Sequence, residues 1–492
     1  MKKFILSIDQ GTTGTTALLV DAENYKVIGK VNTEFKQIFP HSGWVEHDLE
    51  DIWSSLKISI KKLLNDTQID IKNIISIGIT NQRETTCAYS KDGSPLANAI
   101  VWQDRRTASF CENNKDGYKG MQKTTGLPLD PYFSATKMNW FLTNSDKIKT
   151  ASESEDLCLS TIDTFLLYRL TNSKSFKTEP SNASRTLLMN LEDCSWDKKL
   201  LDFFDIKEEF LPKICDSFES FGKTEGLEFL PDGIEINCIL GDQQAALFGQ
   251  GGNTKGDLKC TYGTGAFILL NTGHQIQYSK NNLLTTVAYK HKGETVYALE
   301  GATYIAGAAV QWIRDNFDLI DSASEIEGFA KEAQESNMEE LLFLPFFTGI
   351  GSPYWNSEAR GAILGLSRAT NKSELMRACL EGIALSVNDS IQALISDAGF
   401  EIDKVLVDGG ASQNNFLMQL QSNFSKCSIV RPEVTETTAY GVALGALIGS
   451  NQISLSDIKS LWKKDKDFQP TGKDYFENKT VLWNATIKKL FC

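Results

Sequence analysis

The sequence of 492 residues has few histidines and no paired cysteines. Its four histidines are spread along the chain, and none of its ten cysteines forms a Cys-x-x-Cys pair or a cluster with a histidine. Because protein zinc sites are built from such Cys/His spacings, we expect no zinc centre. Scattered cysteines are typical of reduced thiols, so we expect a cytoplasmic protein.

Long apolar runs and an excess of positive charge are also absent. No apolar run approaches the 18 residues that a membrane span needs, so we expect no membrane insertion. The first apolar run stops at Asp9, which is too short for a signal peptide. The net charge is −13, which argues against a nucleic-acid partner. With 41% hydrophobic and 23% charged residues, the composition is that of a globular protein.

Two glycine-threonine turns lie about 250 residues apart. The first, residues 9–14, follows an apolar run, and the second, residues 262–265, precedes one. Bare backbone N–H groups and threonine hydroxyls at such turns can hold a phosphate. Asp9 is placed to hold the metal ion that a phosphate chain brings. A hairpin turn would explain either motif alone, but the two together favour a nucleotide held between two similar halves.

The predicted elements repeat one α/β pattern. In the first half we expect strands over residues 4–9, 15–21, 26–36, 74–79, 97–103 and 236–240, with a helix over residues 48–66. In the second half we expect strands over residues 258–272, 284–299 and 404–407, with helices over residues 302–317, 373–397, 414–423 and 440–448. The helix at residues 302–317 is predicted to begin after Glu300-Gly301. Two such series predict a duplicated α/β fold, with domains over residues 1–249 and 250–492.

Polar residues stand where these strands end. The strand ends carry Asp9, Arg83, Glu84, Trp102, Asp242, Thr264 and Asp408. In open α/β sheets, ligands bind beyond the carboxyl ends of the strands. Asp242 lies between a strand and a helix, so from position alone it is equally suited to be a general base or a helix N-cap.

Several motifs carry a family resemblance that spans residues 4 to about 450. They include Asp-Gln-Gly-Thr-Thr at 9–13, Asn-Gln-Arg-Glu at 81–84, Gly-Asp-Gln-Gln at 241–244, Tyr-Gly-Thr-Gly at 262–265 and Val-Asp-Gly-Gly at 407–410. With these motifs the chain resembles the FGGY family of carbohydrate kinases. The resemblance implies two ribonuclease-H/actin-like domains with a cleft between them.

The resemblance also implies an activity. The Asn-Gln-Arg-Glu stretch separates the members of the family that act on glycerol from its sugar kinases. The implied reaction is ATP-dependent phosphorylation of glycerol to sn-glycerol 3-phosphate, an entry step of glycerol catabolism. The implied ligands are glycerol, ATP and Mg²⁺, and the implied assembly is a homodimer or homotetramer.

A glycerol site follows from the resemblance and from side-chain chemistry. Glycerol presents three hydroxyls on an apolar backbone, so its site needs donors, acceptors and an apolar wall. The implied site residues are Arg83, Glu84, Trp102, Tyr132, Asp242, Gln243 and Phe267. Asp242 is the implied general base.

The implied nucleotide contacts come from both halves. They are Thr12, Thr13, Gly14, Thr16, Thr264, Gly307, Gln311, Gly410 and Asn414, with Asp9 holding Mg²⁺ through water. The sequence departs from many family members at Thr16, where they have an arginine. We expect Arg185 or Lys259 to supply the missing cation, or nucleotide affinity to be weaker.

Two other functions stay open at this stage. A kinase for a pentulose, hexulose or tetritol would need more polar partners than the aromatic walls Trp102 and Phe267. An actin-like or chaperone-like ATPase that switches a protein interaction would have no use for Arg83, Glu84 and Asp242. Glycerol-dependent release of ADP from ATP would distinguish these possibilities.

Overall fold

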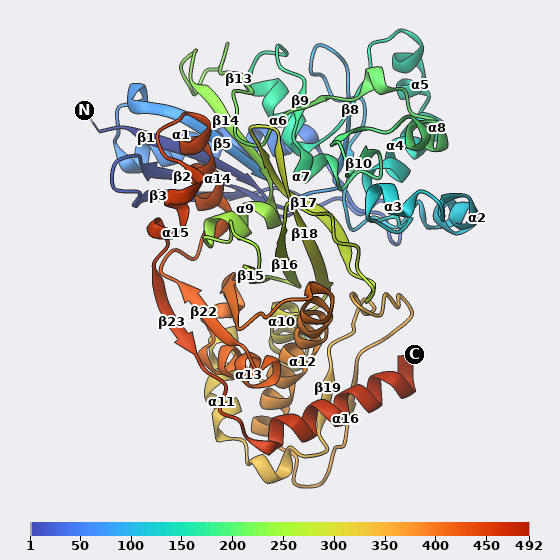
Figure 1. Ribbon diagram of the computed structural model, residues 1–492, viewed down its shortest axis with the longest axis vertical. Coiled ribbons are helices and arrows are strands. Elements are labelled where there is room, and N and C mark those ends of the chain that lie inside the picture. The colour runs from blue at the N-terminus through green and yellow to red at the C-terminus, as the bar shows by residue number, and fades with distance from the viewer. Residues whose placement is uncertain (1, 492) are drawn as a thin grey trace.

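The structure is a computed structural model that describes residues 2–491. Its chain forms two lobes, stacked one above the other in Figure 1, each with a mixed β-sheet. The upper sheet has the order β13 (Gly222–Lys223), β14 (Glu235–Gly241), β5 (Ile74–Asn81), β1 (Phe4–Gln10), β2 (Gly14–Asp21), β3 (Val27–Glu34). The lower sheet has the order β17 (Leu284–His291), β18 (Glu294–Thr303), β16 (Ala266–Gly273), β15 (Leu258–Tyr262), β21 (Lys404–Asp408), β22 (Ser428–Pro432), β23 (Lys464–Phe468).

The two sheets share one topology. In the upper sheet, β1 pairs antiparallel with β2 and parallel with β5, and β5 pairs parallel with β14. In the lower sheet, β15 pairs antiparallel with β16 and parallel with β21, and β21 pairs parallel with β22. The series β3-β2-β1-β5-β14 therefore corresponds to β18-β16-β15-β21-β22. This duplicated α/β fold, predicted from the order of elements, is confirmed.

Helices cover both faces of the upper sheet. The amphipathic α1 (Leu49–Thr67) packs on β2 and β3, and the side chain of Asp48 caps its first turn. The opposite face is covered by α14 (Thr437–Gly449), which contacts β1, β5 and β14. This helix comes from the second half of the chain, yet it lies in the upper lobe (Figure 1). The last part of the chain therefore fixes the two halves to each other.

Small residues let α14 approach α9 (Asp242–Gly249) closely. A Cβ at Gly441 would lie 2.0 Å from the carbonyl oxygen of Ala245, and one at Gly249 would lie 2.0 Å from that of Thr437. Because real Cβ atoms do not come that close to backbone atoms, the contact requires both glycines. The helix that begins with Asp242 is thus held by backbone-to-backbone packing.

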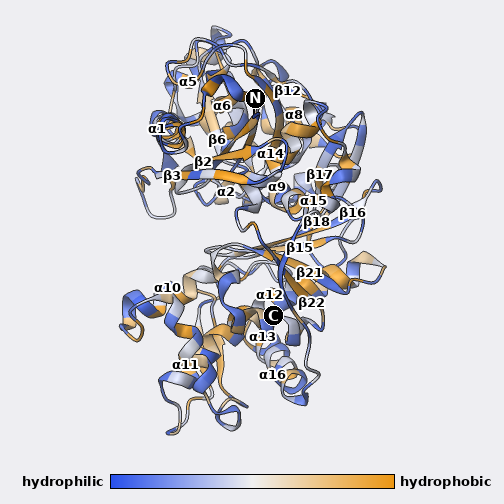
Figure 2. Ribbon diagram, turned by 90° about the vertical axis from the view of Figure 1, so that its left-hand side faces the viewer, coloured by the Kyte–Doolittle hydropathy of each residue, from blue (hydrophilic) through white to orange (hydrophobic). Residues whose placement is uncertain are grey.

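The lower lobe has helices around its sheet. They are α10 (Gly307–Phe317), α11 (Ile326–Glu332), α12 (Lys372–Ala398), α13 (Asn415–Ser425) and α16 (Asp474–Phe491). The longest, α12, begins with a capping box in which Asn371 and Glu374 bond each other's backbone, and it ends at Gly399 in a left-handed conformation. Figure 2 shows apolar residues along the sheets and the inner helices of both lobes.

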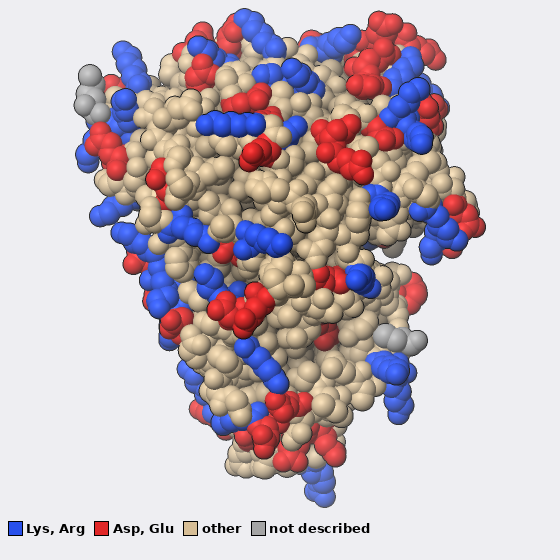
Figure 3. Space-filling view, viewed as in Figure 1, with Lys and Arg blue, Asp and Glu red and all other residues tan. Residues whose placement is uncertain are grey.

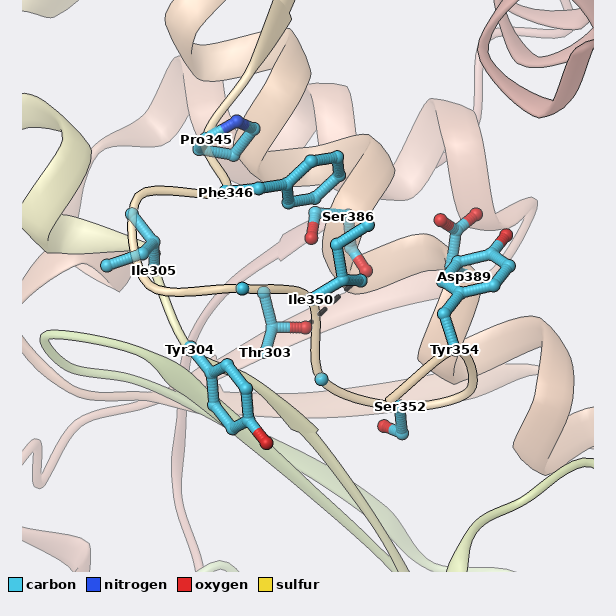
Figure 4. Close-up of a pocket in the computed structure, with 12 residues that line it drawn as sticks. Thr303, Tyr304, Ile305, Pro345, Phe346, Ile350, Ser352, Tyr354, Ser386 and Asp389 are labelled. Atoms are coloured by element: carbon cyan, nitrogen blue, oxygen red, sulfur yellow. Dashed lines mark hydrogen bonds between the residues drawn. The ribbon is translucent and has the colours of Figure 1, made fainter. Parts of the chain in front are cut away.

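A half-buried carboxylate lines a small cavity together with Thr303, at the end of β18. Asp389 of α12 accepts hydrogen bonds from the indole N–H of Trp483, at 2.8 Å, and from the hydroxyl of Tyr354. Figure 4 shows Asp389 next to Tyr354; elsewhere in the same cavity the hydroxyl of Thr303 donates to the carbonyl oxygen of Ser386. Burial raises the pKa of Asp389 from 3.8 to about 7.

Several predicted elements differ from the structure. The ranges 258–272 and 284–299 each contain a turn, so the first forms β15 and β16 and the second forms β17 and most of β18. The helix predicted over residues 302–317 begins only at Gly307, because β18 runs on to Thr303, which pairs with Ala266 of β16. Residue Glu300 therefore lies inside a buried strand. The strand predicted over residues 97–103 is reduced to β7 (Ala99–Ile100), because residues 101–104 turn back on themselves.

The surface and the helices carry two further observations. Figure 3 shows acidic and basic side chains interspersed over one face, which is hollowed between the lobes at its right-hand edge. Among residues 2–491, no helix is long and apolar enough to cross a membrane.

Candidate active site

The turn that follows β5 brings Arg83 and Glu84 into the interior. Glu84 has a φ of 60°, a left-handed conformation that is uncommon for glutamate. Its carbonyl oxygen accepts hydrogen bonds from Ser134 and Thr86, which stabilise this turn. Arg83 and Glu84 are each at most 2% exposed, so both side chains point away from solvent. Strained backbone of this kind is typical of functional sites.

Two arginines and two glutamates form a buried ionic network. Arg83 binds Glu300 through both terminal nitrogens, at 2.6 and 2.8 Å. Arg185 donates to Glu84 at 2.6 Å and to Glu300 at 3.2 Å. Burial alone would raise the pKa of Glu300, but the charges of Arg185 and Arg83 outweigh it and hold this pKa at about 2. Burial raises the pKa of Glu84, and the two arginines offset only part of that effect.

Asp242 lies beside this network and is 30% exposed. The Nε atom of Arg83 is 3.1 Å from its Oδ1, and the backbone N–H of Gln243 donates to the same oxygen at 2.7 Å. The N-cap of α9 is Gly241, not Asp242, so the N-cap interpretation of Asp242 is wrong. A Cβ at Gly241 would lie 2.6 Å from Arg83, and therefore the pairing of Arg83 with Asp242 depends on a glycine there.

Gln243 connects Asp242 to a buried lysine. Its amide N–H donates to Asp242 at 3.0 Å, and its amide oxygen accepts from Lys259 at 2.6 Å. Lys259 also donates to Thr261, and burial lowers its pKa. The Gln243 amide is thus fixed by a donor on one side and an acceptor on the other.

The three predicted aromatic residues come together from different elements. The ring of Trp102 is 5.7 Å from that of Tyr132 and 6.2 Å from that of Phe267, both in edge-on contact. The indole N–H of Trp102 donates to the hydroxyl of Thr12 at 3.0 Å, which connects this aromatic group to the first glycine-threonine turn. The turn that carries Tyr132 is held by Lys137, whose buried ammonium donates to the carbonyl oxygens of residues 131–133.

A cavity of about 490 Å³ in the lower lobe collects part of the predicted nucleotide contacts. Its lining includes Thr264, Gly307, Gln311, Gly410 and Asn414. A Cβ at Gly307 would lie 2.7 Å from the carbonyl oxygen of Gly263, so the second turn packs directly on the start of α10. The side chain of Asn414 caps α13.

The other predicted nucleotide contacts lie in the upper lobe. Thr12, Thr13, Gly14 and Thr16 lie on the turn between β1 and β2 and on β2 itself, so they do not line the cavity. Thr16 pairs across the strands with Asp9 and with Asn32, whose amide donates to its hydroxyl at 2.9 Å. Burial, together with the charges of Asp242 and Glu436, raises the pKa of Asp9 to about 8.

Both expected substitutes for the missing arginine are bound elsewhere. Arg185 and Lys259 are fully buried, and their hydrogen bonds go to Glu84, Glu300, Gln243 and Thr261. A cation that sequence reasoning did not consider is Lys30 of β3, which is 45% exposed and bonds Glu436 at 2.5 Å. Lys30 lies two residues from Asn32, the cross-strand partner of Thr16.

Sequence reasoning also missed Glu300, although a signal was present. It is the one carboxylate in the otherwise uncharged run at residues 295–303. A charged residue inside such a strand is rarely buried unless it is paired. Two guanidinium nitrogens of the network, Nε of Arg83 and Nη1 of Arg185, are buried without a hydrogen-bond partner.

Two family models match the chain, the N-terminal domain of the FGGY family of carbohydrate kinases over residues 4–249 and the C-terminal domain over residues 258–450. The chain belongs to the FGGY family of carbohydrate kinases. This confirms the resemblance found in the motifs. The fold of this FGGY kinase is accordingly the two-domain fold with actin-like, ribonuclease-H-like sheets.

Several curated glycerol kinases are similar to this chain over nearly their whole length. The chain is 44% identical to the glycerol kinase of Staphylococcus epidermidis, covering 99% of this chain and 98% of that protein. It is 47% identical to the glycerol kinase of Bdellovibrio bacteriovorus, covering 95% of each. Among solved structures, the Plasmodium falciparum glycerol kinase with ADP superposes with a TM-score of 0.91 at 35% identity, covering 100% of this chain and 99% of that one.

Proposed function

We propose that this FGGY kinase transfers the γ-phosphoryl group of ATP to glycerol, giving sn-glycerol 3-phosphate and ADP. The observation that carries the proposal is the turn that places Arg83 and Glu84 beside Asp242, with a buried Nε of Arg83 that faces Asp242 but has no hydrogen-bond partner. Buried donors in native proteins nearly always have a partner, so this nitrogen is available to a substrate hydroxyl. The full-length similarity to glycerol kinases supports the same substrate.

Glycerol fits the mixed character of this site. The ionic side chains can bind its hydroxyls, and the aromatic group of Trp102, Tyr132 and Phe267 can cover its carbon backbone. Burial and the neighbouring charge of Glu84 raise the pKa of Tyr132 well above its usual range, so its phenol remains a neutral donor. A larger polyhydroxy sugar would need polar partners in place of these three rings.

Asp242 is proposed to be the general base. It would accept the proton of the reacting primary hydroxyl while that oxygen forms the new bond to the γ-phosphorus. The bond between the γ-phosphorus and the β,γ-bridging oxygen breaks, and ADP carries away the electron pair. Because the transition state is loose, the hydroxyl is deprotonated late and an ordinary carboxylate suffices. The hydrogen bonds from Gln243 hold both oxygens of Asp242 in place.

The nucleotide is proposed to lie between the two turns. The cavity lined by Gly307, Gln311, Gly410 and Asn414 would hold the adenosine, and Thr264 and the upper turn at residues 11–14 would bind phosphates. Asp9 would hold Mg²⁺ through water, and the ion would neutralise charge on the phosphates. Burial raises the pKa of Asp9 most, and the charges of Asp242 and Glu436 raise it further; this repulsion fits the role, because a cation relieves it. Among residues 2–491, no group of three or more His, Cys, Asp or Glu side chains could by itself hold a metal ion.

The protein is proposed to act in the cytoplasm as a homodimer or homotetramer. The use of ATP favours the cytoplasm, and the family resemblance favours a homodimer or homotetramer. The alternative role as a nucleotide-driven switch for a protein partner leaves the network around Arg83 without a purpose.

The test is release of ADP from MgATP with glycerol, xylulose, erythritol, gluconate or no second substrate, together with ³¹P NMR of the product. We expect rapid ADP release with glycerol and a phosphomonoester signal of glycerol 3-phosphate. Equal or faster turnover with one of the other polyols, or ADP release that does not depend on glycerol, would reject the proposal.

A further inference from the structure

Glu300 is the acidic centre of the ionic network, and it comes from the second half of the chain. It lies on β18, whereas its partners Arg83 and Arg185 come from the half that carries Asp242. Its side chain is 0% exposed and accepts two hydrogen bonds from Arg83 and one from Arg185. The strand is anchored to the first half, because the hydroxyl of Tyr297 on β18 donates to the carbonyl oxygen of Leu191. Glu300 is therefore rigidly placed.

Arg83 lies between two carboxylates and uses a different edge for each. Its terminal nitrogens bind Glu300 in a bidentate pair, whereas its Nε faces Asp242 at 3.1 Å without forming a hydrogen bond. A guanidinium that lost Glu300 would be free to turn its terminal nitrogens to Asp242, because Glu84, the other carboxylate that acts on Arg83, is already bound by Arg185. Bidentate pairs between arginine and a carboxylate are the stronger arrangement.

Resting on the function proposed above, we infer that Glu300 is a positioning residue for phosphoryl transfer. It binds the terminal nitrogens of Arg83, neutralises much of its charge, and so keeps Arg83 from pairing tightly with Asp242. The Nε of Arg83 then remains available to a glycerol hydroxyl, and Asp242 remains available to accept the proton. Glu300 itself touches neither the transferred group nor the nucleotide in this scheme.

The inference predicts a specific effect of replacing Glu300. In Glu300→Gln the charge of Arg83 loses its strongest partner and is offset only by Glu84, so it acts more strongly on Asp242 and makes that carboxylate a poorer proton acceptor. We expect kcat/KM for glycerol to fall about 10- to 100-fold, as for loss of a charged hydrogen-bond pair. We also expect the acidic limb of the kcat–pH profile to move about one pH unit to lower pH. The other charged groups that act on Asp242 are Lys259 and Asp9, and neither is changed.

The experiment measures kcat, the KM for glycerol and the kcat–pH profile of the wild-type chain, Glu300→Gln and Glu294→Gln. Glu294 lies on the same strand, is exposed, and is far along β18 from the network, so its variant is a control for loss of one charge. ADP affinity, measured by calorimetry, reports whether the nucleotide site is intact. The expected result is a lower kcat/KM with a shifted acidic limb for Glu300→Gln alone.

Each outcome of this experiment is informative. A folded Glu300→Gln protein with unchanged ADP affinity, whose acidic limb does not move, would overturn the inference and leave Glu300 with a structural role. If Glu300→Gln does not fold, Glu300→Asp decides, because it keeps the charge but its side chain is one methylene shorter, which withdraws the carboxylate from the terminal nitrogens of Arg83. We expect it to lose at least about 10-fold in kcat/KM, and wild-type kinetics would overturn the inference. Absence of glycerol-dependent turnover in the wild-type chain would instead reject the proposed function.

Discussion

Replacement of Asp242 by asparagine is the most direct test of the proposed chemistry. The carboxamide has nearly the same volume and its oxygen can still accept the N–H of Gln243, which bonds Oδ1 at 2.7 Å. It cannot accept the proton of the glycerol hydroxyl. The change therefore removes the proton acceptor and, because a carboxamide has one oxygen, also the 3.0 Å hydrogen bond from the side chain of Gln243, while the backbone of α9 stays in place.

The structure indicates how much stability and activity the variant should lose. Asp242 is 30% exposed and its contact with Arg83 is not a hydrogen bond, so loss of this ion pair should cost less than about 1 kcal/mol of unfolding free energy. A general base contributes roughly 10²- to 10⁴-fold to the rate, so kcat should fall by at least about 100-fold. Binding of glycerol should change much less, because Arg83, Glu84 and the aromatic group remain.

The assay combines steady-state ADP release with thermal unfolding and with calorimetry of glycerol binding. The expected variant unfolds within a few degrees of the wild-type chain, binds glycerol and is almost inactive. A kcat above about one tenth of the wild-type value would show that Asp242 is not the base, since even a weak general base contributes about 100-fold. A variant that fails to bind glycerol would place Asp242 in substrate binding instead.

Three further variants test other parts of the structure. Arg83→Ala should raise the KM for glycerol far more than the KM for ATP. It should also destabilise the protein by about 3–5 kcal/mol, because Glu300 then stays buried with only Arg185 as a partner. An unchanged melting temperature in a thermal scan would contradict the stabilising role of this ionic network. Thr16→Arg should tighten ADP binding several-fold in calorimetry. Thr16 is the cross-strand partner of Asp9, so an arginine there would place a cation near the proposed phosphate site. Unchanged affinity for ADP would mean that position 16 does not face the phosphates. Asp389 has a pKa raised from 3.8 to about 7, so the folded chain binds its proton more tightly than the unfolded chain between these values. The unfolding free energy should therefore fall as pH rises through this window, by roughly 4 kcal/mol at most. Asp389→Asn should melt at a higher temperature than the wild-type chain at pH 8 but not at pH 4. Equal melting temperatures of the two proteins at pH 8 would refute the raised pKa of Asp389.

Local patterns were sufficient to predict most of the architecture. The apolar runs that end at Asp9, Asn81 and Gly241 are parallel neighbours in the upper sheet, so their polar ends meet at one edge, as the sequence predicted. The Asn-Gln-Arg-Glu motif placed Arg83 and Glu84 at the end of β5. Such predictions succeed because a buried central strand needs a continuous apolar run, and its polar end is then conspicuous.

Long-range pairing could not be predicted in the same way. The sequence offered Lys259 or Arg185 as the cation that replaces the arginine at position 16. In the structure both side chains are hydrogen-bonded to other residues, Lys259 to Gln243 and Arg185 to Glu300. Nothing local to Lys30 marks it as a neighbour of Glu436, because these residues are 406 positions apart. Contacts of this kind depend on how the two halves meet.

Glu300 illustrates the same limit most clearly. The sequence predicts a strand that stops at residue 299 and a helix that begins after Glu300-Gly301. In the structure, β18 continues because β16 on one side and β17 on the other supply hydrogen bonds as far as Thr303 and Glu300 respectively. The burial of its charge is tolerable only because two arginines from the other half of the chain meet it there. The partners of Glu300 are more than 100 positions away in the sequence, so no local pattern reveals its role. The one local signal is that a single charged residue stands in an apolar strand. A single charged residue within an apolar strand is therefore the feature to search for in other chains of this fold.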